Sequence, residues 1–465
     1  MQVIKLEKLY YDNKWRIPNS KKKFIHQNYN NFKIQLINCN DKDVENSTIA
    51  ASKSLELFKK ISNSKKSKIL QKISIIIKKN SFKLAELESI ELGKNLESAQ
   101  KEMLACANLW KNASKIIKKK KLKIIKKKNI LLYELLEPIG VVALIIPWNF
   151  PMLVLSERLP YILAAGNSAV IKASEFGSLS INYFIKLIHK VGLPKGIISF
   201  LTGDHDTGKN ISKDKNISMI SFTGSTETGK KIYQISSSTI KRLSLELGGK
   251  NPMAVLSDAN MQKAADDVIY SFTHNAGQCC VSGSRLFLQN DIKKKFLNII
   301  KKKLGVKNNI QNIATKNQYL KVKKIIIKSI KKKIPIIFRN KKLFDDKKGI
   351  INPIIFKATK KNDILDKEIF GPVLTVDTFK NTNQLVKKMN DTKYGLAALI
   401  WTKNKNKAMD LALKLKSGRI WVNGNIAQNY PDLSIGGYKE SGLNRETGEA
   451  GIKTYSEIKS IIVNS

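Results

Sequence analysis

The sequence predicts an α/β protein built from two doubly wound α/β domains and a small additional β element. After Pro138, short apolar runs alternate with helical segments, and a second region of this kind extends from about Asn251 to about Pro431. The chain has 465 residues and a hydrophobic fraction of 42%, which is enough for more than one core. Strands that alternate with helices are typical of parallel βαβ units.

The first third of the chain is predicted to be mainly helical. Residues 5–15 alternate like a strand and a turn, whereas residues 47–80 and 82–117 carry apolar side chains at helical spacing, with lysine on the outer faces. No proline lies between Pro18 and Pro138, so long helices are permitted. We therefore expect long amphipathic helices before the first buried strand.

Two segments outside this scheme have a β-like pattern. In residues 118–137 a lysine run precedes Ile124-Ile125 and the apolar stretch that starts at Ile130, which predicts extended strands with charge on one face. Residues 452–463 near the end of the chain also have the pattern of a strand.

The central part of the chain is predicted to form a parallel sheet. Buried strands are expected at residues 140–146, 168–172, 197–201 and 217–222, and helices are expected at residues 153–165 and 179–191. Three polar motifs come at or just after strand ends: Pro147-Trp148-Asn149, Lys172-Ala173-Ser174-Glu175 and Thr223-Gly224-Ser225-Thr226. Because ligands bind such sheets at the carboxyl ends of the strands, we expect these motifs to face one cleft.

The formal net charge of +47 raises the question of nucleic-acid binding. Only seven of the 84 basic residues are arginine, which is the better bidentate phosphate ligand. Lysine is abundant along the whole chain, including the predicted helix faces. This distribution favours solvated lysine surfaces over a nucleic-acid site, and no nucleic-acid partner is expected.

Cysteine usage and hydropathy indicate the compartment. Four cysteines, Cys39, Cys106, Cys279 and Cys280, have no zinc-binding spacing and are too few for a disulfide framework, so no metal site and a reducing compartment are expected. The N-terminus lacks an apolar signal core. The longest mostly apolar run, residues 139–152, is too short to span a bilayer. We expect a soluble cytoplasmic protein without a membrane partner.

Three residues could together carry out chemistry on a carbonyl group. Cys279 and Cys280 lie in a glycine-flanked polar loop, where a thiol is more often reactive than inert, but the residues alone do not decide which one is the nucleophile. Glu246 lies in an apolar run that ends in Gly248-Gly249, so its carboxylate is either paired in a core or exposed by the glycine turn to a cleft, and burial would raise its pKa and suit a general base. A thiol and a base suffice to form a thioester and hydrolyse it.

The third of these residues, Asn149, lies between two prolines that fix the local backbone. Its amide is therefore either a preorganised donor for a developing oxyanion or a group that satisfies its own turn.

Two further motifs suggest a nucleotide. Gly224 would let the backbone approach a phosphate, and Ser225 could cap the following helix or donate to a pyrophosphate, although the segment lacks the three-glycine dinucleotide fingerprint. Lys172 and Glu175 could hold the two hydroxyls of an adenine ribose. A plain capped turn and an ordinary surface ion pair are the alternatives.

Taken together, the motifs resemble the aldehyde dehydrogenase superfamily over nearly the whole chain. The resemblance rests on residues 245–250, 277–280, 368–373 and 436–442, which occur in the family's order. It implies that Cys280 is the nucleophile, Asn149 an oxyanion donor and Glu246 the general base.

The same resemblance implies an NAD site. Lys172 and Glu175 would bind the adenine ribose, and Trp148, Gly224 and Ser225 would lie near the pyrophosphate. Glu368 would hold the nicotinamide ribose with Phe370 beside the ring.

It also implies three structural parts. A coenzyme-binding domain would comprise residues 1–117 and 138–247, and a catalytic domain residues 248–433. Residues 118–137 and 434–465 would form an oligomerisation element of a homodimer or homotetramer.

The predicted activity is NAD-dependent oxidation of an aldehyde to a carboxylic acid through a cysteine thiohemiacetal and thioester. Residues 157–160 and 435–442 resemble members that act on betaine aldehyde or another small polar aldehyde, and Trp110, Trp421 and Tyr430 are candidates to line a pocket for a cation.

Two alternative functions are a coenzyme-A-acylating aldehyde dehydrogenase, which Glu246 argues against, and a basic nucleic-acid-binding protein on a degenerate enzyme scaffold. NAD is expected over NADP because a carboxylate at Glu175 would repel a 2′-phosphate.

Overall fold

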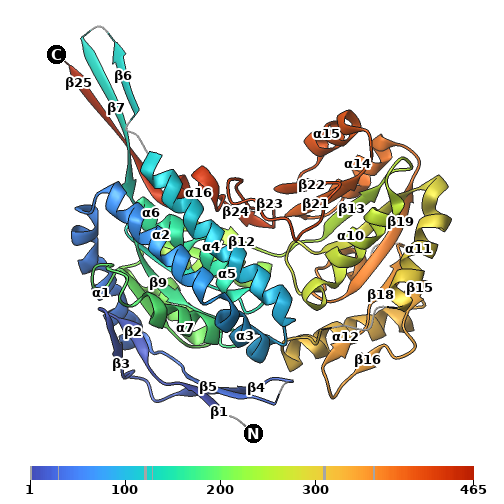
Figure 1. Cartoon of the computed structure of the whole chain (residues 1–465), viewed down its shortest axis with the longest axis horizontal. Helices are drawn as coiled ribbons and strands as arrows, with labels where there is room; N and C mark the ends of the chain where they lie inside the picture. The colour runs from blue at the N-terminus through green and yellow to red at the C-terminus, as the bar shows by residue number, and fades with distance from the viewer. Residues whose placement is uncertain are drawn as a thin grey trace.

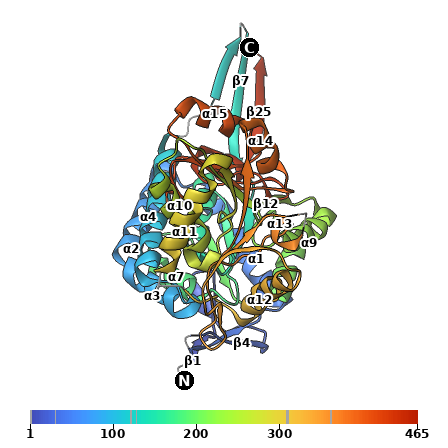
Figure 2. The ribbon, with the colours of Figure 1, turned by 90° about the vertical axis from the view of Figure 1, so that its right-hand side faces the viewer.

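The structure, a computed structural model, describes residues 3–29, 31–119, 123–127, 129–306, 311–359 and 362–464. It contains two large sheets, each covered by helices on both faces, in two lobes that lie side by side (Figure 1). A narrow three-stranded sheet projects from the first lobe in both views (Figures 1 and 2). The predicted fold class of two α/β units with a small β element is confirmed.

The first large sheet has the strand order β24-β12-β11-β8-β9-β10-β2-β3. Its strands are β24 (Gly442–Leu443), β12 (Arg242–Glu246), β11 (Met219–Thr223), β8 (Val141–Ile145), β9 (Ser168–Lys172), β10 (Ile198–Leu201), β2 (Leu9–Tyr11) and β3 (Lys14–Arg16). The five strands from β12 to β10 are parallel, and the edge strands β24, β2 and β3 are antiparallel. The strand order reverses between β8 and β11, which is where ligands bind sheets of this kind.

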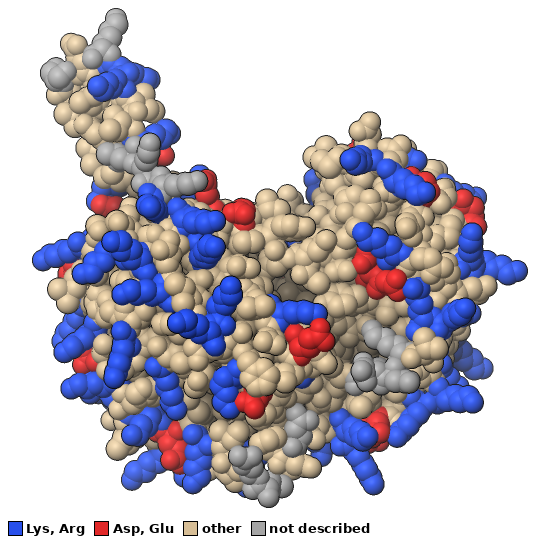
Figure 3. All heavy atoms as spheres, viewed as in Figure 1, with Lys and Arg blue, Asp and Glu red and all other residues tan. Residues whose placement is uncertain are grey.

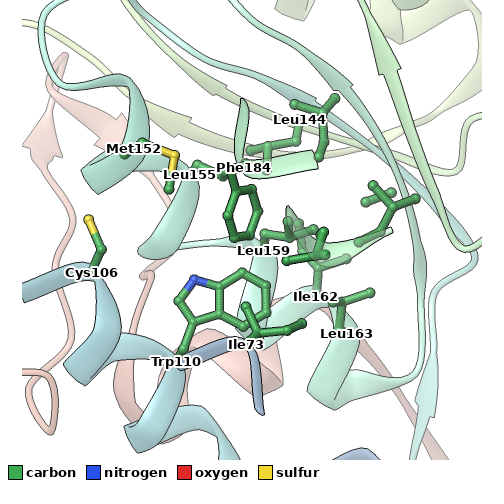
Figure 4. Packing of buried hydrophobic residues seen from close by; sticks show 14 of the residues in the cluster. Ile73, Cys106, Trp110, Leu144, Met152, Leu155, Leu159, Ile162, Leu163 and Phe184 are labelled. Carbon is green, nitrogen blue, oxygen red and sulfur yellow. The ribbon is translucent and has the colours of Figure 1, made fainter. Parts of the chain in front are cut away.

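The strands of this sheet are apolar on both sides because helices cover both faces. In β8, Val142 and Leu144 face one core, while Val141 and Ala143 face the other. The larger core contains Trp110, whose ring lies 5.7 Å from that of Phe184 (Figure 4).

The helices of the first lobe are α1 (Asp41–Lys59), α2 (Asn63–Lys79), α3 (Ser81–Leu92), α4 (Leu96–Lys119), α5 (Pro151–Ser156), α6 (Leu159–Ala165), α7 (Leu179–Ile188), α8 (His205–Lys213) and α9 (Thr226–Ser236). The helix expected at residues 47–80 is two helices, because Ser62 caps a new helix by accepting from the Lys65 N–H. The helix expected at residues 153–165 is also two, with a break between Ser156 and Leu159.

The second large sheet has the order β15-β18-β19-β14-β13-β21-β22. Its strands are β13 (Asn251–Val255), β14 (Gly283–Gln289), β15 (Ile336–Arg339), β18 (Ile354–Lys357), β19 (Val373–Phe379), β21 (Ala397–Trp401) and β22 (Arg419–Val422). All are parallel to their neighbours except the edge strand β15. The helices around it are α10 (Met261–Thr273), α11 (Lys293–Gly305), α12 (Lys316–Lys331), α13 (Asp363–Asp366), α14 (Thr382–Asn390) and α15 (Lys405–Lys414).

The projecting sheet is formed by distant parts of the chain. β7 (Ile130–Pro138) lies between β6 (Lys123–Lys127) and β25 (Ser456–Asn464), all antiparallel. The rest of the 434–465 range does not lie in this sheet: β24 extends the first large sheet, β23 (Tyr438–Lys439) pairs with β20 (Tyr394–Gly395), and α16 (Gly448–Thr454) packs against α6.

The N-terminal residues form more strands than expected. β1 (Val3–Leu6), β5 (Lys33–Ile37) and β4 (Lys23–Gln27) make a separate three-stranded sheet, and residues 9–16 form a hairpin at the edge of the first large sheet. A two-stranded ribbon of β16 (Phe344–Asp345) and β17 (Ile350–Ile351) lies beside α12. Among the helices in the described ranges, none has both the length and the apolar character needed to cross a bilayer.

Candidate active site

The polar motifs of the first lobe leave the sheet at one edge. The strand register pairs Ile145 with Lys172 and with Phe222, and it pairs Thr223 with Glu246. The carboxyl ends of β8, β9, β11 and β12 are therefore level with one another. This places the segments that follow them at the edge predicted from the sequence, on both sides of the point where the strand order reverses.

Asn149 is held against the loop that carries the two cysteines. Its Nδ2 donates to the main-chain oxygen of Gln278 at 3.1 Å, and the Nδ2 of Asn275 donates back to the main-chain oxygen of Asn149 at 3.3 Å. The Asn149 side chain is buried, with a relative exposure of 6% for the residue. An amide nitrogen has two hydrogens, so one N–H can bind Gln278 while the other is available to a substrate oxygen.

The cysteine loop has an unusual backbone. Asn275, Ala276 and Gly277 have φ values of 49°, 55° and 74°, so three consecutive residues are left-handed. At Gly277 a β-carbon would lie 2.4 Å from the backbone of Gly371, so only glycine allows this approach. Strained backbone of this kind clusters at functional sites, where the surrounding structure holds it in place.

Cys280 and Glu246 line the same cavity, which has a volume of about 250 Å³. Both lobes contribute to its walls, and it extends to the segment after β22. Other lining residues include Glu102, Phe150, Glu157, Tyr270, Arg419 and Trp421. Asn149 does not line the cavity itself, but its neighbour Phe150 does.

Glu246 has the electrostatics of a poised base. Burial raises the pKa of its carboxyl group to about 8, and the negative charges of Glu446 and Glu157 add to the rise. The Arg158 guanidinium opposes it. Oε1 of Glu246 is buried without a hydrogen-bond partner among the described residues, so a lone pair remains for a proton from water.

Cys280 is partly exposed, whereas Cys279 is buried. A hydrogen bond with Cys279, together with burial and the negative charge at Cys279, raises the pKa of the Cys280 thiol well above its ordinary value. The carboxylates of Glu246 and Glu157 raise it further. The thiol is therefore protonated at neutral pH until a positive charge arrives or a base removes its proton.

Gly249 brings the base and the nucleophile loops together. A β-carbon there would lie 2.7 Å from the main-chain oxygen of Cys280, so the two loops touch at this glycine. The neighbouring Asn251 donates from Nδ2 to the same oxygen at 2.8 Å and to the main-chain oxygen of Ser282 at 2.9 Å. The position of Cys280 relative to the loop after Glu246 is thus fixed by packing and by two hydrogen bonds.

Lys172 and Glu175, which are expected to bind the adenine ribose, lie at the end of β9 and just after it. The Lys172 side chain is 6% exposed, and its Nζ lies 3.7 Å from Oε2 of Glu175 while donating to the main-chain oxygen of Ala173 at 3.0 Å. Burial lowers the pKa of Lys172. A largely buried ammonium beside a partly exposed carboxylate offers a donor and an acceptor to a pair of hydroxyls.

The turn after β11 has the geometry for a phosphate. Ser225 caps α9 by accepting from the Thr228 N–H at 3.2 Å, and the Gly224 N–H donates to the main-chain oxygen of Glu246 at 3.1 Å. The helix N-terminus therefore points at the same edge as Glu246, and its free N–H groups favour an anion there.

Glu368 and Phe370 come from the second lobe and reach the first. Oε1 of Glu368 accepts from the Gly249 N–H at 3.0 Å, and burial raises the pKa of this carboxyl group to about 7. The ring of Phe370 lies 5.6 Å from that of Trp148, edge to face. Glu368 and Phe370 thus meet residues of the first lobe's polar motifs, and a carboxylate beside an aromatic ring fits a ribose and a nicotinamide.

The structure adds residues that sequence reasoning did not assign to the site. Glu157, Arg158 and Glu102 line the cavity. The first two could have been noticed in the sequence, because they are consecutive charged residues inside an otherwise apolar helical segment. Among the three aromatic candidates, only Trp421 lines the cavity; Trp110 is buried in the core with Nε1 bonded to Ser156, and Tyr430 is 52% exposed. Within the described ranges there is no group of three or more side chains suited to a metal ion.

Comparisons with known proteins agree with one another. A sequence model described as the aldehyde dehydrogenase family matches residues 19–461. Betaine aldehyde dehydrogenase of Bacillus subtilis is 34% identical, covering 87% of this chain and 86% of its own length. Aldehyde dehydrogenase 1A1 of Gallus gallus is 33% identical and covers 99% of this chain and 94% of its own length.

Solved structures give the same result for the fold. An NAD-dependent aldehyde dehydrogenase from Sinorhizobium meliloti superposes with a TM-score of 0.95 at 31% identity, covering 99% of this chain and 95% of its own. A betaine aldehyde dehydrogenase from Staphylococcus aureus, solved in complex with NAD+, superposes with a TM-score of 0.93 at 30% identity, covering 98% and 97%.

Proposed function

The chain belongs to the aldehyde dehydrogenase family and is an NAD-dependent enzyme of that family, and on this premise we propose that it oxidises a small polar aldehyde to a carboxylic acid at Cys280. The observation that carries the proposal is that Cys280 lines one cavity with Glu246, whose Oε1 has no hydrogen-bond partner within the described ranges. A nucleophile and a base in one small cavity are the two groups that formation and hydrolysis of a thioester require.

In the first half of the reaction, the Cys280 thiol releases its proton to solvent, the sulfur bonds to the aldehyde carbon, and the carbonyl oxygen gains negative charge. The second N–H of Asn149 donates to this oxygen, and one such donor typically contributes about 2.7–4 kcal/mol of barrier lowering. Bound NAD would supply the hydride acceptor, and loss of hydride from the aldehyde carbon would leave a thioester on Cys280. The positive charge of a bound nicotinamide, held by Glu368 and Phe370, would lower the pKa of Cys280.

In the second half, Glu246 removes a proton from water and the water oxygen attacks the thioester carbon. The carbon–sulfur bond breaks, the acid leaves, and the sulfur of Cys280 regains a proton. No side chain or backbone group in the described part of the chain hydrogen-bonds Oε1 of Glu246, which supports this role. The test is NADH formation with a small aldehyde; wild-type turnover by Cys280→Ala would refute the proposal.

The substrate is proposed to be betaine aldehyde or another small polar aldehyde. The ring of Trp421 lines the cavity and suits a cation, and the carboxylates of Glu102 and Glu157 line it too, each paired with a cation of the chain, Lys94 and Arg158 respectively. Arg419 lines it too and favours an anionic group, so the charge of the substrate needs a direct comparison.

Betaine aldehyde and 3,3-dimethylbutanal have nearly the same shape and differ in charge, so they form a matched pair for this comparison. A preference of more than about tenfold in kcat/KM for the cation, on the order of 1.4 kcal/mol, would support betaine aldehyde. Equal use of both would contradict a cation site, and faster oxidation of an aldehyde that carries a carboxylate would assign the main role to Arg419.

We also propose that the chain forms a homodimer or homotetramer through the sheet of β6, β7 and β25. We place this assembly in the cytoplasm, and we propose the division into a coenzyme-binding domain, a catalytic domain and an oligomerisation element that the family resemblance implies. Support for the assembly comes from the exposed apolar side chains of this sheet, Ile124, Ile125, Ile458, Ile461 and Ile462. Light scattering of Ile462→Lys against the wild type tests this: a smaller species is expected, and an unchanged mass would count against the assignment.

No nucleic-acid partner is proposed. Lysine and arginine are scattered over the face seen in Figure 3 and do not gather in one patch. Salt-sensitive RNA binding without dehydrogenase turnover would favour the alternative.

A further inference from the structure

Lys94 is a buried cation just behind the active-site segment. It follows α3, and its side chain is 2% exposed. Its Nζ donates to Oε2 of Glu88 and to Oε2 of Glu102, both at 2.6 Å, and lies 4.4 Å from the ring centroid of Phe150. An ammonium removed from water in this way needs such partners, and here two carboxylates and an aromatic face supply them.

Glu88 connects this cation to the backbone next to Asn149. Its other oxygen, Oε1, accepts from the Met152 N–H at 3.1 Å and from Ser180 Oγ at 3.2 Å. Met152 is the second residue of α5, and Phe150 at the N-cap of that helix supplies no capping side chain. The carboxylate of Glu88, on α3, therefore accepts the hydrogen bond that a capping side chain would otherwise accept.

Residues 149–152 are thus held in place by contacts on two sides. On one side, the cysteine loop binds Asn149 through Gln278 and Asn275. On the other, Glu88 holds the Met152 N–H and Lys94 lies against the ring of Phe150. Only the contacts made by Glu88 and Lys94 come from outside the catalytic loops.

We propose that Lys94 is a positioning residue that, through Glu88 and Phe150, sets the direction in which the Asn149 amide points. The inference rests on the proposed role of Asn149 as the oxyanion donor. A donor contributes only when it is aligned with the oxygen that develops charge, so a small rotation of this segment reduces turnover without touching any reacting group.

The link to Glu102 extends the same unit to the cavity wall. Glu102 lines the cavity, and its Oε1 lies 4.0 Å from Nε2 of His274. His274 stacks on Phe150 and on Tyr270, with ring centroids 5.9 and 4.8 Å apart. Lys94 thereby joins the amide segment and the substrate-facing wall into one rigid group.

The test is a double-mutant cycle between Lys94 and Asn149. Lys94→Met is expected to lower kcat about tenfold or more while KM for NAD changes less than about twofold, because the cofactor contacts lie elsewhere. In an Asn149→Ala background the same substitution should change kcat less than about twofold, since there is no amide left to misplace. Lys83→Met removes an exposed lysine that pairs with Glu86 on α3, and is the matched control with wild-type kcat.

The results of this cycle support or overturn the positioning role of Lys94. An equal loss of kcat in both backgrounds, or a wild-type kcat for Lys94→Met, would overturn the inference. If Lys94→Met does not fold, Lys94→Gln, which retains a donor, takes its place, and failure of both to fold would assign Lys94 a purely structural role. A wild-type enzyme without aldehyde-dependent NADH formation would instead refute the proposed function.

Discussion

The side-chain amide of Asn149 donates to the main-chain oxygen of Gln278, two residues before Cys280, at 3.1 Å. The proposed oxyanion donor and the proposed nucleophile are therefore connected through a single hydrogen bond and two peptide units. This connection fixes one N–H of the amide on the cysteine loop and leaves the other for a substrate oxygen. The chemistry and the shape of the loop depend on the same side chain.

We expect Asn149→Ala to lower kcat by about 10²–10³, the range for loss of one oxyanion donor. The reason is that the developing charge on the carbonyl oxygen loses its side-chain donor. Steady-state NADH formation measures this. The binding of NAD, followed by protein fluorescence, should be almost unchanged, and a loss confined to NAD binding would contradict the assignment.

Cys279→Ala is expected to lower the pKa of Cys280, because the hydrogen bond with Cys279 is the largest cause of its rise. At a fixed pH below that pKa, the thiolate fraction increases, so alkylation by iodoacetamide should become faster. The measurement is the inactivation rate from pH 6 to 10. Cys39→Ala, at a buried cysteine in the other core of the first lobe that does not line the cavity, is the control with an unchanged profile. A slower reaction in Cys279→Ala would show that the neighbouring thiol activates Cys280.

Glu246→Gln is expected to slow thioester hydrolysis by about 10²–10⁴, the usual contribution of a general base. Because burial raises the pKa of Glu246 to about 8, the ionised fraction and the hydrolysis rate should rise with pH up to about that value in the wild type. Stopped-flow detection of an NADH burst followed by a slow steady state checks this. A variant that keeps the wild-type pH profile would exclude Glu246 as the base.

The raised pKa of Glu246 also predicts that the stability of the fold falls with rising pH, whereas the hydrolysis rate rises. The folded chain retains a proton on Glu246 that the unfolded chain releases between the ordinary pKa of 4.5 and about 8. The contribution of this group to stability therefore falls as the pH rises through that window. Glu246→Gln should accordingly have a higher Tm relative to wild type at pH 9 than at pH 5, and the reverse order would contradict the raised pKa.

Glu175→Gln is expected to reduce the preference for NAD over NADP by about tenfold, on the order of 1.4 kcal/mol. Glu175 lies 3.7 Å from the Lys172 ammonium, and its negative charge would repel a 2′-phosphate. The ratio of kcat/KM for the two cofactors is the measurement. Glu56→Gln, at an exposed acidic residue on α1, is the comparison for a general change in charge. Equal effects of both substitutions would mean that long-range charge decides the preference.

Gly277→Ala is expected to damage both stability and turnover. Its φ of 74° is unfavourable for alanine, and the added β-carbon would lie 2.4 Å from the Gly371 backbone. Gly192→Ala isolates the first effect, because its φ is 96° and nothing lies within 4 Å of the new β-carbon. We expect about 1–2 kcal/mol of destabilisation for Gly192→Ala and a clearly larger value, with loss of kcat, for Gly277→Ala. Denaturant unfolding of the two variants gives the comparison.

The fold class could be predicted from the sequence, and so could the position of the polar motifs at one edge of the first large sheet. Apolar runs of strand length followed by polar motifs predict a parallel sheet with its ligands at one edge, and the register of Ile145, Lys172 and Glu246 agrees with this. Local patterns could not reveal that Ser62 starts a new helix, because residues 47–80 keep lysine on the outside throughout.

Contacts between distant residues were beyond the reach of sequence patterns. Glu157 and Arg158 form a buried pair at 3.1 Å, and only the packing of α5 and α6 brings that pair to the cavity. Likewise, a lysine and a glutamate separated by seven residues carry no signal of the bond from Lys94 to Glu102, which depends on how α4 starts. Residues near 120–122 and 128, within the predicted strand region of 118–137, lie outside the described ranges.

The most direct test of the central claim is mass spectrometry of Glu246→Gln after a single mixing with aldehyde and NAD. The account predicts one NADH per active site and an acyl group on the peptide that carries Cys280, and it predicts that Cys280→Ala in the same background abolishes both. NADH formation without an acyl adduct, or an adduct on Cys279 alone, would contradict it.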